Sequence, residues 1–177
     1  ALILPGLTLV ISPLIALMKD QVDALRRKDI DATFINSSLS RKARESRYRA
    51  LKDGQYKLLY VTPERFRKPE FVEIIQSREI SLLAVDEAHC ISEWGHDFRP
   101  DYTRLNEFRS LLGKPVTIAL TATATPEVQE DIVQQLGLKQ DESKLFHQGI
   151  ERPNLNLDVA EVWGEDEKVE KIVETIK

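Results

Sequence analysis

The 177-residue sequence has a single cysteine, Cys90, and no long hydrophobic run. One cysteine excludes both a disulfide framework and a multi-cysteine zinc site. No apolar stretch approaches the roughly 20 residues that cross a bilayer, so we expect no membrane span. The first residues, Ala1 to Gly6, have no basic flank and no small-residue cleavage site, and the initiator Met is missing too. They are therefore no signal peptide, and we interpret the start as a cut edge of a cytoplasmic protein.

Neither sign of charge is in large excess, because the formal net charge is only −4. Seven acids and three lysines lie in residues 158–177, so the rest of the chain is balanced. Such a balance argues weakly against a uniformly basic nucleic-acid surface and leaves local basic faces open. The basic run Arg41 to Arg49 is more typical of a solvated helix face than of a DNA-binding stripe.

Short apolar runs alternate with longer amphipathic ones. The short runs predict strands at 7–11, 32–35, 57–61, 80–85 and 116–120, and the amphipathic runs predict helices at 14–25, 40–52, 71–75, 102–112 and 125–136. Thr125 as N-cap before Pro126 marks the start of the last helix, and Gly137 marks its end. Strands that are apolar on both faces indicate an α/β fold, with a parallel sheet between two layers of helices.

The pattern weakens after His147. Residues 151–154 resemble a linker, followed by one expected strand at 155–159 and one acidic helix at 165–176. This tail is too small to be a domain by itself. We therefore divide the chain into a domain at 1–150 and a separate tail at 151–177.

Three polar clusters follow predicted strands. They are Ser12-Pro13, Asp86-Glu87-Ala88-His89, and Thr121 to Thr125. Ligands of open parallel sheets bind at the carboxyl ends of the strands, where these clusters lie. Two adjacent carboxylates repel each other, and a Mg²⁺ ion bound to phosphates would compensate for this. Asp86 would then contact the metal and Glu87 would orient or deprotonate a water. The alternative is an acid pair turned to solvent.

One stretch of the chain resembles a known family. The box Asp86-Glu87-Ala88-His89 (DEAH), followed by the run from Ile91 to Tyr102 with Trp-Gly-His-Asp-Phe-Arg-Pro inside it, closely resembles the RecQ family of superfamily-two DNA helicases. Residues 12–21, 62–65, 120–124 and 152–154 match as well. The resemblance implies a RecA-like domain of the P-loop NTPase type. It also implies an ATP-dependent 3′-to-5′ DNA helicase of recombination and repair, with ATP and Mg²⁺ as cofactors and single-stranded and partly duplex DNA as partners.

The same resemblance implies roles for individual residues. Asp86 and Glu87 would be the Mg²⁺-binding and water-activating acids, and His89 with Thr121 and Thr123 would link the nucleotide site to the DNA site. Residues of the aromatic-rich loop would sense single-stranded DNA, and two strand-to-helix turns would contact its backbone. The loop residues are Trp94, His96, Phe98 and Arg99, and the turn residues are Ser12, Pro13, Leu14, Thr62 and Arg65.

Aromatic faces can stack on bases while an arginine supplies charge for phosphates. The alternatives are that Trp94 and Phe98 are core aromatics and that His96 is a surface histidine. Cys90 is more plausibly a buried small residue than a nucleophile or metal ligand.

The sequence departs from this family in one respect. No Gly-Lys-Ser/Thr is present, and Gly113-Lys114-Pro115 does not qualify. By the resemblance, the strand and loop that cradle phosphates would lie upstream of Ala1, and only the opening of the second motor domain would follow Arg152. We therefore expect no ATPase or unwinding activity from the chain alone. We also expect either marginal stability or dimerisation through exposed sheet edges.

Two other functions stay open. A non-catalytic nucleic-acid-binding or regulatory module could keep this fold without the phosphate loop. An RNA helicase of the broader superfamily is the third possibility, and the aromatic-rich loop argues against it.

Overall fold

The structure is a computed structural model that describes residues 1–94, 97–147, 153–156 and 158–176. The chain divides into two compact units, residues 1–144 and residues 145–177. All five strands belong to the first unit, which also holds every residue of the candidate site described below.

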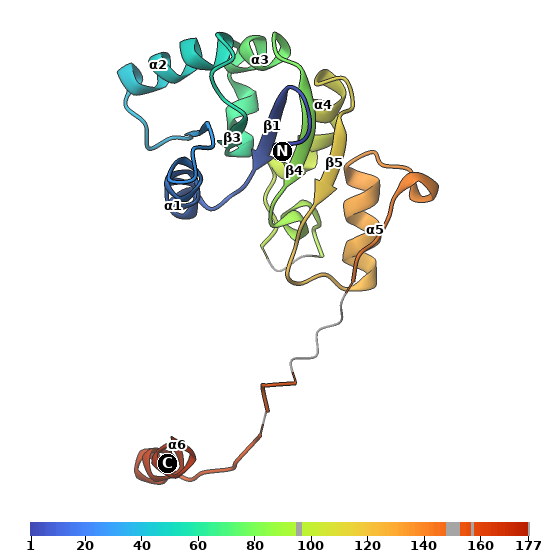
Figure 1. Cartoon of the computed structure of the whole chain (residues 1–177). Helices are drawn as coiled ribbons and strands as arrows, with labels where there is room; N and C mark the ends of the chain where they lie inside the picture. Colours follow the sequence, from blue (N-terminus) through green and yellow to red (C-terminus); the bar gives the residue numbers. More distant parts are fainter. Residues whose placement is uncertain (95–96, 148–152, 157, 177) are drawn as a thin grey trace. The chain divides into compact units, whose positions relative to one another are not determined.

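The five strands form one sheet in which every neighbouring pair is parallel (Figure 1). Their order is β2-β3-β1-β4-β5, so the first strand of the chain lies at the centre. The strands are β1 (Leu7–Ile11), β2 (Ala32–Ile35), β3 (Leu58–Val61), β4 (Ile80–Val85) and β5 (Val116–Ala119). The predicted strands are confirmed to within one residue at their ends, because short apolar runs between turn residues leave little freedom in placement.

Helices follow the strands as the periodicity predicts. In the described residues they are α1 (Ile15–Arg26), α2 (Arg41–Lys52), α3 (Pro69–Gln76), α4 (Leu105–Leu111), α5 (Pro126–Gln135) and α6 (Glu165–Ile176), with 3₁₀ turns η1 (Pro63–Arg67), η2 (Ala88–Ile91), η3 (Tyr102–Arg104) and η4 (Gln140–Glu142). The Thr125 hydroxyl accepts the N–H of Val128, which confirms the predicted N-cap. None of the helices described here is long and apolar enough to cross a membrane.

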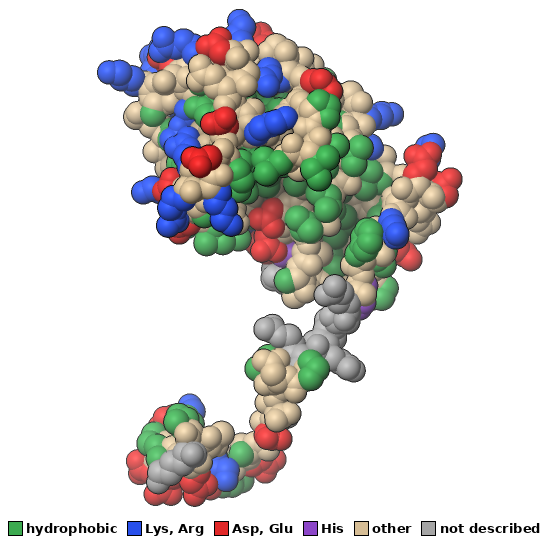
Figure 2. Space-filling view, viewed as in Figure 1, with side chains coloured by type: hydrophobic (Ala, Val, Ile, Leu, Met, Phe, Trp, Pro, Cys, Tyr) green, Lys and Arg blue, Asp and Glu red, His purple; other side chains and the backbone are tan. Residues whose placement is uncertain are grey.

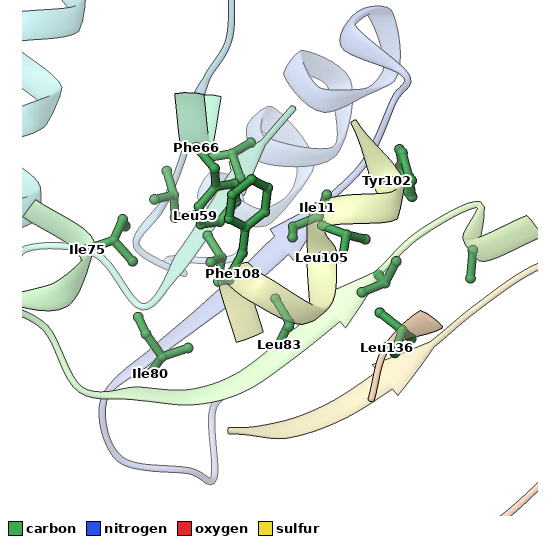
Figure 3. Close-up of a cluster of buried hydrophobic side chains, with 14 of the residues drawn as sticks. Ile11, Leu59, Phe66, Ile75, Ile80, Leu83, Tyr102, Leu105, Phe108 and Leu136 are labelled. Atoms are coloured by element: carbon green, nitrogen blue, oxygen red, sulfur yellow. The ribbon is translucent and has the colours of Figure 1, made fainter. Parts of the chain in front are cut away.

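Alternate strand residues face two separate cores. Leu59 and Val61 of β3 face the larger core, whereas Leu58 faces a smaller one that also contains Met18 and Val22 of α1. In the larger core the rings of Phe66 and Phe108 stack with centroids 4.3 Å apart (Figure 3). Helix α1 therefore covers one face of β2 and β3, and the other helices of this unit that reach a core cover the opposite face.

The far end of the sheet is less well covered. Val116 and Ile118 of β5 remain 69% and 45% exposed, and Figure 2 shows apolar side chains gathered over this part of the sheet. The buried residues of the smaller core come only from α1, β2, and β3. The predicted α/β fold is confirmed, but its third layer stops before β4 and β5.

The second unit contains α6, whose apolar residues Val169, Ile172 and Val173 are each about half exposed. The strand expected at 155–159 is wrong for its described residues, which lie in neither helix nor strand. A single strand without a neighbour leaves its backbone hydrogen bonds unmade, so an apolar run alone does not form one.

Candidate functional site

The carboxyl ends of β1 and β4 bring Ser12 and Asp86 together. The two strands run side by side, with Ile11 paired to Val85, and the N–H of Asp86 donates to the Ile11 carbonyl at 2.8 Å. The next side chains along the two strands therefore meet. The Ser12 hydroxyl donates to Asp86 Oδ2 at 2.9 Å. Two of the three polar clusters that the sequence places at strand ends thus share one edge of the sheet.

Asp86 is held at three of its oxygens. Besides the Ser12 contact at Oδ2, its Oδ1 accepts the N–H of Glu87 at 3.0 Å. Its main-chain carbonyl accepts the hydroxyl of Tyr102 at 3.1 Å. Tyr102 is fully buried, and burial is the main cause that raises the pKa of its phenol. Ser12 and the neighbouring Glu87 N–H therefore orient the carboxylate, and Tyr102 holds the main chain of Asp86.

Glu87 has a left-handed backbone conformation, with φ 48° and ψ 47°. This region is costly for a residue with a long side chain and is found mostly where function requires it. The Glu87 side chain is 31% exposed. It therefore lies beside the half-buried Asp86 with access to water, as a group that orients a water would.

His89 connects the acid pair to the end of β5. It is 5% exposed, and its Nδ1 lies 2.9 Å from Thr121 Oγ1 and 3.4 Å from Glu87 Oε2. Thr121 Oγ1 in turn accepts the N–H of Thr123 at 3.3 Å. The third polar cluster thus joins the first two at the same edge, as the strand-end argument predicts.

In the aromatic-rich segment, which runs from Ile91 to Tyr102, Trp94 and Phe98 face the solvent whereas Tyr102 is buried. Trp94 is 84% exposed and Phe98 is 36% exposed, so the alternative of core aromatics is wrong. The N–H of Arg99 donates to the Cys90 carbonyl at 2.9 Å, and its guanidinium pairs with Asp97 at 2.7 Å. The candidate residue His96 lies outside the described residues.

A cleft of about 270 Å³ lies between the turns after β1 and β3 and the aromatic-rich segment. The residues that line it are Pro13, Ile15, Thr62, Pro63, Glu64, Arg99 and Asp101. The structure thus gathers the two turns that the sequence assigned to a nucleic-acid backbone, together with Arg99. Leu14 is half-buried at the start of α1.

Thr62 and Arg65 have different environments from each other. Thr62 lines the cleft and is 2% exposed, and its buried hydroxyl has no hydrogen-bond partner among the residues that the structure describes. Arg65 is 8% exposed and does not line the cleft. It lies beside Tyr48, whose pKa is raised by burial and lowered by the Arg65 charge. The Arg65 side chain therefore packs η1 against the protein interior near Tyr48.

The structure also tests the predictions for Cys90 and for the basic run on α2. Cys90 is fully buried, and burial raises the pKa of its thiol to about 11, so it is the inert small residue that the sequence indicates. On α2, Arg41 pairs with Glu45 at 2.7 Å while remaining 85% exposed. The basic run is largely a solvated helix face, as predicted, and Arg47 is the exception because its guanidinium lies over the Phe34 ring.

The oxygen ligands at this end of the sheet suit a divalent cation that keeps part of its shell for waters and phosphate oxygens. Within the described ranges, no three His, Cys, Asp or Glu side chains gather into a metal site. Mg²⁺ commonly takes one or two carboxylates and completes its shell with waters and phosphate oxygens. Among the described residues, Asp86 Oδ1 and Oδ2 each accept one hydrogen bond and keep further lone pairs for such a ligand.

Sequence reasoning missed two contacts. It assigned Ser12 to DNA, whereas the buried Ser12 hydroxyl is bonded to Asp86. It named Tyr102 only as the end of the aromatic-rich segment and gave it no role. Strand order would have revealed the first contact, and a sequence does not state which strands are neighbours. No local signal points to the second.

A parallel sheet with an acid pair at its carboxyl edge places the first unit in the class of RecA-like helicase motor domains. The Pyrococcus furiosus Hef helicase domain superposes with a TM-score of 0.54 at 22% identity, covering 76% of this chain and 28% of that one. A hypothetical ATP-dependent RNA helicase from Sulfolobus tokodaii gives 0.53 at 19% identity, covering 73% and 37%. At these identities the likeness shows the fold alone.

A profile of the DEAD/DEAH box helicase family matches residues 4–132, and the chain belongs to that family. It is 49% identical over 175 residues to the ATP-dependent DNA helicase RecQ of Bacillus subtilis, covering 98% of this chain and 29% of the relative. The Haemophilus influenzae RecQ is 43% identical over 176 residues, covering 98% and 28%. The resemblance to RecQ helicases is confirmed, and the chain spans less than a third of these relatives.

Proposed function

We propose that the chain is part of a RecQ-type ATP-dependent DNA helicase that unwinds DNA in the 3′-to-5′ direction during recombination and repair, in the cytoplasm or nucleoid. Residues 1–150 would belong to its first motor domain, and residues 151–177 would open the second. One observation carries the proposal. Asp86 is hydrogen-bonded both to the turn after β1 and to the end of the aromatic-rich segment. An acid suited to a nucleotide-bound metal is thus joined to two candidate DNA-contacting segments.

At the nucleotide end, Asp86 would hold Mg²⁺ and Glu87 would orient or deprotonate a water, with Thr121 and Thr123 nearby. Bound Mg²⁺ would neutralise charge on the phosphates of ATP. The protein's own contribution is positional. The contacts of Asp86 fix its carboxylate, and Glu87 has a partly exposed carboxylate beside it. His89, bonded to Thr121, would pass a change at the end of β5 to the acid pair.

At the DNA end, the cleft would receive the sugar-phosphate backbone. The turn at Thr62, which lines the cleft, would lie against a phosphate, and Arg99 would supply charge. The exposed rings of Trp94 and Phe98 would stack on bases, which tolerates any sequence. Bases of a single strand, or of the unpaired part of a partial duplex, are available for such stacking.

The uncovered end of the sheet supports the view that more chain belongs to this domain. The bare face and free edge of β5 would accept a further strand and helix, and we propose that these carry the phosphate-binding loop that the present sequence lacks. Phosphoryl transfer depends on holding the phosphates, and an arginine finger alone is worth roughly 10³–10⁵ in rate. The chain by itself should therefore bind DNA without hydrolysing ATP.

The isolated chain should also self-associate through β5. On the opposite edge of the sheet, Arg26 donates to the Ala32 carbonyl at 2.8 Å, and Arg47 donates to the Phe34 carbonyl while lying 4.2 Å from that ring. These guanidinium groups block strand addition at β2. The β5 edge has only apolar and Thr side chains, which is the pattern that invites strand pairing.

The experiment that tests the function compares two proteins. In a longer protein that carries this chain behind a phosphate-binding loop, single-stranded DNA should stimulate ATP turnover, and Asp86→Asn or Glu87→Gln should lower it at least 100-fold. Glu93→Gln, at an exposed acid nearby, is the matched control. Residues 1–177 alone should show no turnover. Turnover that persists in the Asp86 and Glu87 variants would contradict the proposed chemistry.

A non-catalytic nucleic-acid-binding module remains the second candidate, because no Gly-Lys-Ser/Thr is present. Absence of ATP turnover in the longer protein, with DNA binding intact, would favour it. Stimulation by RNA equal to or above that by DNA would instead favour an RNA helicase.

A further inference from the structure

Ser12 does not present its hydroxyl to a bound strand. The side chain is 3% exposed, and its hydroxyl proton is donated to Asp86 Oδ2. The Ser12 oxygen also accepts the N–H of Leu14 at 3.3 Å. The hydroxyl is therefore a bridge between the backbone of the turn after β1 and the carboxylate of the acid pair.

This bridge lies between the cleft and the acid pair. Pro13 and Ile15, on either side of Leu14, line the cleft proposed for DNA, whereas Asp86 lies at the end proposed for the metal. The register of β1 against β4 fixes the main chain on both sides, through the bond from Asp86 N–H to the Ile11 carbonyl. A displacement of the turn would therefore move the Ser12 hydroxyl and, through its hydrogen bond, the Asp86 carboxylate.

A carboxylate that binds a metal depends on the groups that orient it. Loss of such an orienting partner typically costs 10–100-fold in metal affinity or activity. The other partner of the Asp86 carboxylate is the N–H of Glu87, its chain neighbour, which cannot transmit a signal from a distant segment. Tyr102 contacts only the main-chain carbonyl of Asp86. Ser12 is thus the side chain that both orients the carboxylate and joins it to the cleft.

We propose that Ser12 is a positioning residue, which orients the Asp86 carboxylate for a divalent cation and transmits occupancy of the cleft to it. This inference rests on the proposed function, because it assumes that Asp86 binds the metal and that the cleft binds DNA. It assigns to Ser12 a role different from the direct DNA contact that the family resemblance implied.

The first experiment measures metal binding without enzymatic activity. Mn²⁺ is titrated into the 177-residue chain, and paramagnetic broadening of the Glu87 amide signal is followed by NMR. Ser12→Ala should raise the half-saturating Mn²⁺ concentration about 10-fold. Ser12→Thr keeps the hydroxyl and should restore the affinity to within about threefold of the wild type. Ser77→Ala removes a hydroxyl from an exposed helix end and should change nothing.

The second experiment measures the coupling. Single-stranded oligo-dT is added, and the Leu14 amide signal and the Asp86 carboxyl ¹³C signal are followed together. In the wild type both should shift. In Ser12→Ala the Leu14 shift should remain while the Asp86 shift falls by at least half.

The outcomes separate the two proposals. Equal Mn²⁺ affinity in the wild type and Ser12→Ala, or an Asp86 shift that survives unchanged in Ser12→Ala, would overturn the role of Ser12 and leave the proposed function standing. A wild-type chain that shows neither selective Mn²⁺ broadening near Asp86 nor a DNA-induced shift at Leu14 would refute the proposed function, and the role of Ser12 would fall with it.

Discussion

Replacing Glu87 with asparagine should make the chain more stable while removing a residue that we assign to catalysis. The reason is the backbone of Glu87, which has φ 48° in the left-handed region. An ordinary side chain costs about 1–2 kcal/mol there, whereas asparagine visits this region routinely. A residue selected for stability alone would not be glutamate at this position.

The structure allows the net change in free energy of unfolding to be worked out. Asparagine should recover roughly half of the left-handed cost, about 0.5–1 kcal/mol. Its neutral side chain also ends the repulsion between adjacent carboxylates. The substitution loses the 3.4 Å contact from Glu87 to His89, which is worth less than about 0.5 kcal/mol because the glutamate is 31% exposed. The expected gain is about 0.5 kcal/mol.

For a chain of this length, a gain of that size raises Tm by about 1–2 °C, which differential scanning calorimetry resolves. Lys114→Asn is the matched positive control, because Lys114 has φ 55° and lies outside the site. Glu93→Asn is the negative control, since Glu93 is exposed and is not among the residues with positive φ.

A Glu87→Asn protein that melts at or below the wild-type temperature, while Lys114→Asn melts above it, would refute the reasoning. It would mean that the contacts of the Glu87 side chain outweigh its backbone strain. In the longer protein the same substitution should abolish DNA-stimulated ATP turnover, so stability and activity should move in opposite directions.

Trp94→Ala should weaken single-stranded DNA binding by about 1–3 kcal/mol in fluorescence anisotropy and leave Tm unchanged, because the ring is 84% exposed; a drop in Tm with unchanged binding would show that the ring is structural. Ile118→Lys, on the bare edge of β5, should convert self-associated chain to monomer in sedimentation velocity, and an unchanged distribution would locate the contact elsewhere. Gly137→Ala should lower the free energy of unfolding in urea by about 1 kcal/mol, because its φ is +60°, while the exposed Asn106 side chain, 2.2 Å from the new Cβ, moves aside. Gly113→Ala, with φ +78° and nothing within 4 Å, should lower it by a similar amount, and a much larger loss at Gly137 would contradict this reasoning.

Much of the candidate site could be predicted because its residues follow strands directly. Asp86, His89 and Thr121 lie at the carboxyl ends of apolar runs, and parallel strands place such ends at one edge whatever their order. The exposure of Trp94 was less certain from the sequence, since an aromatic ring serves a core as readily as a surface.

Arg65 and the expected strand at 155–159 show where this reasoning stops. Arg65 matches a DNA-contacting motif by position, but the 3₁₀ turn η1 directs it inward beside Tyr48. The apolar run at 155–159 has the composition of a strand, but a strand needs a neighbour, and composition does not supply one.

The sequence by itself determined the fold class and the position of the acid pair at the end of a strand, because hydrophobic period and strand-end residues are local properties. Only the tertiary structure decided that Ser12 and Tyr102 hold Asp86, that the described residues leave the buried hydroxyl of Thr62 unpartnered, and that β5 is uncovered while β2 is protected by arginines. These features depend on which strands are neighbours and on which residues meet across 74 positions of chain, as Ser12 and Asp86 do. The reason is physical: a contact between distant segments is fixed by the packing of the whole sheet, and no short stretch of sequence contains it.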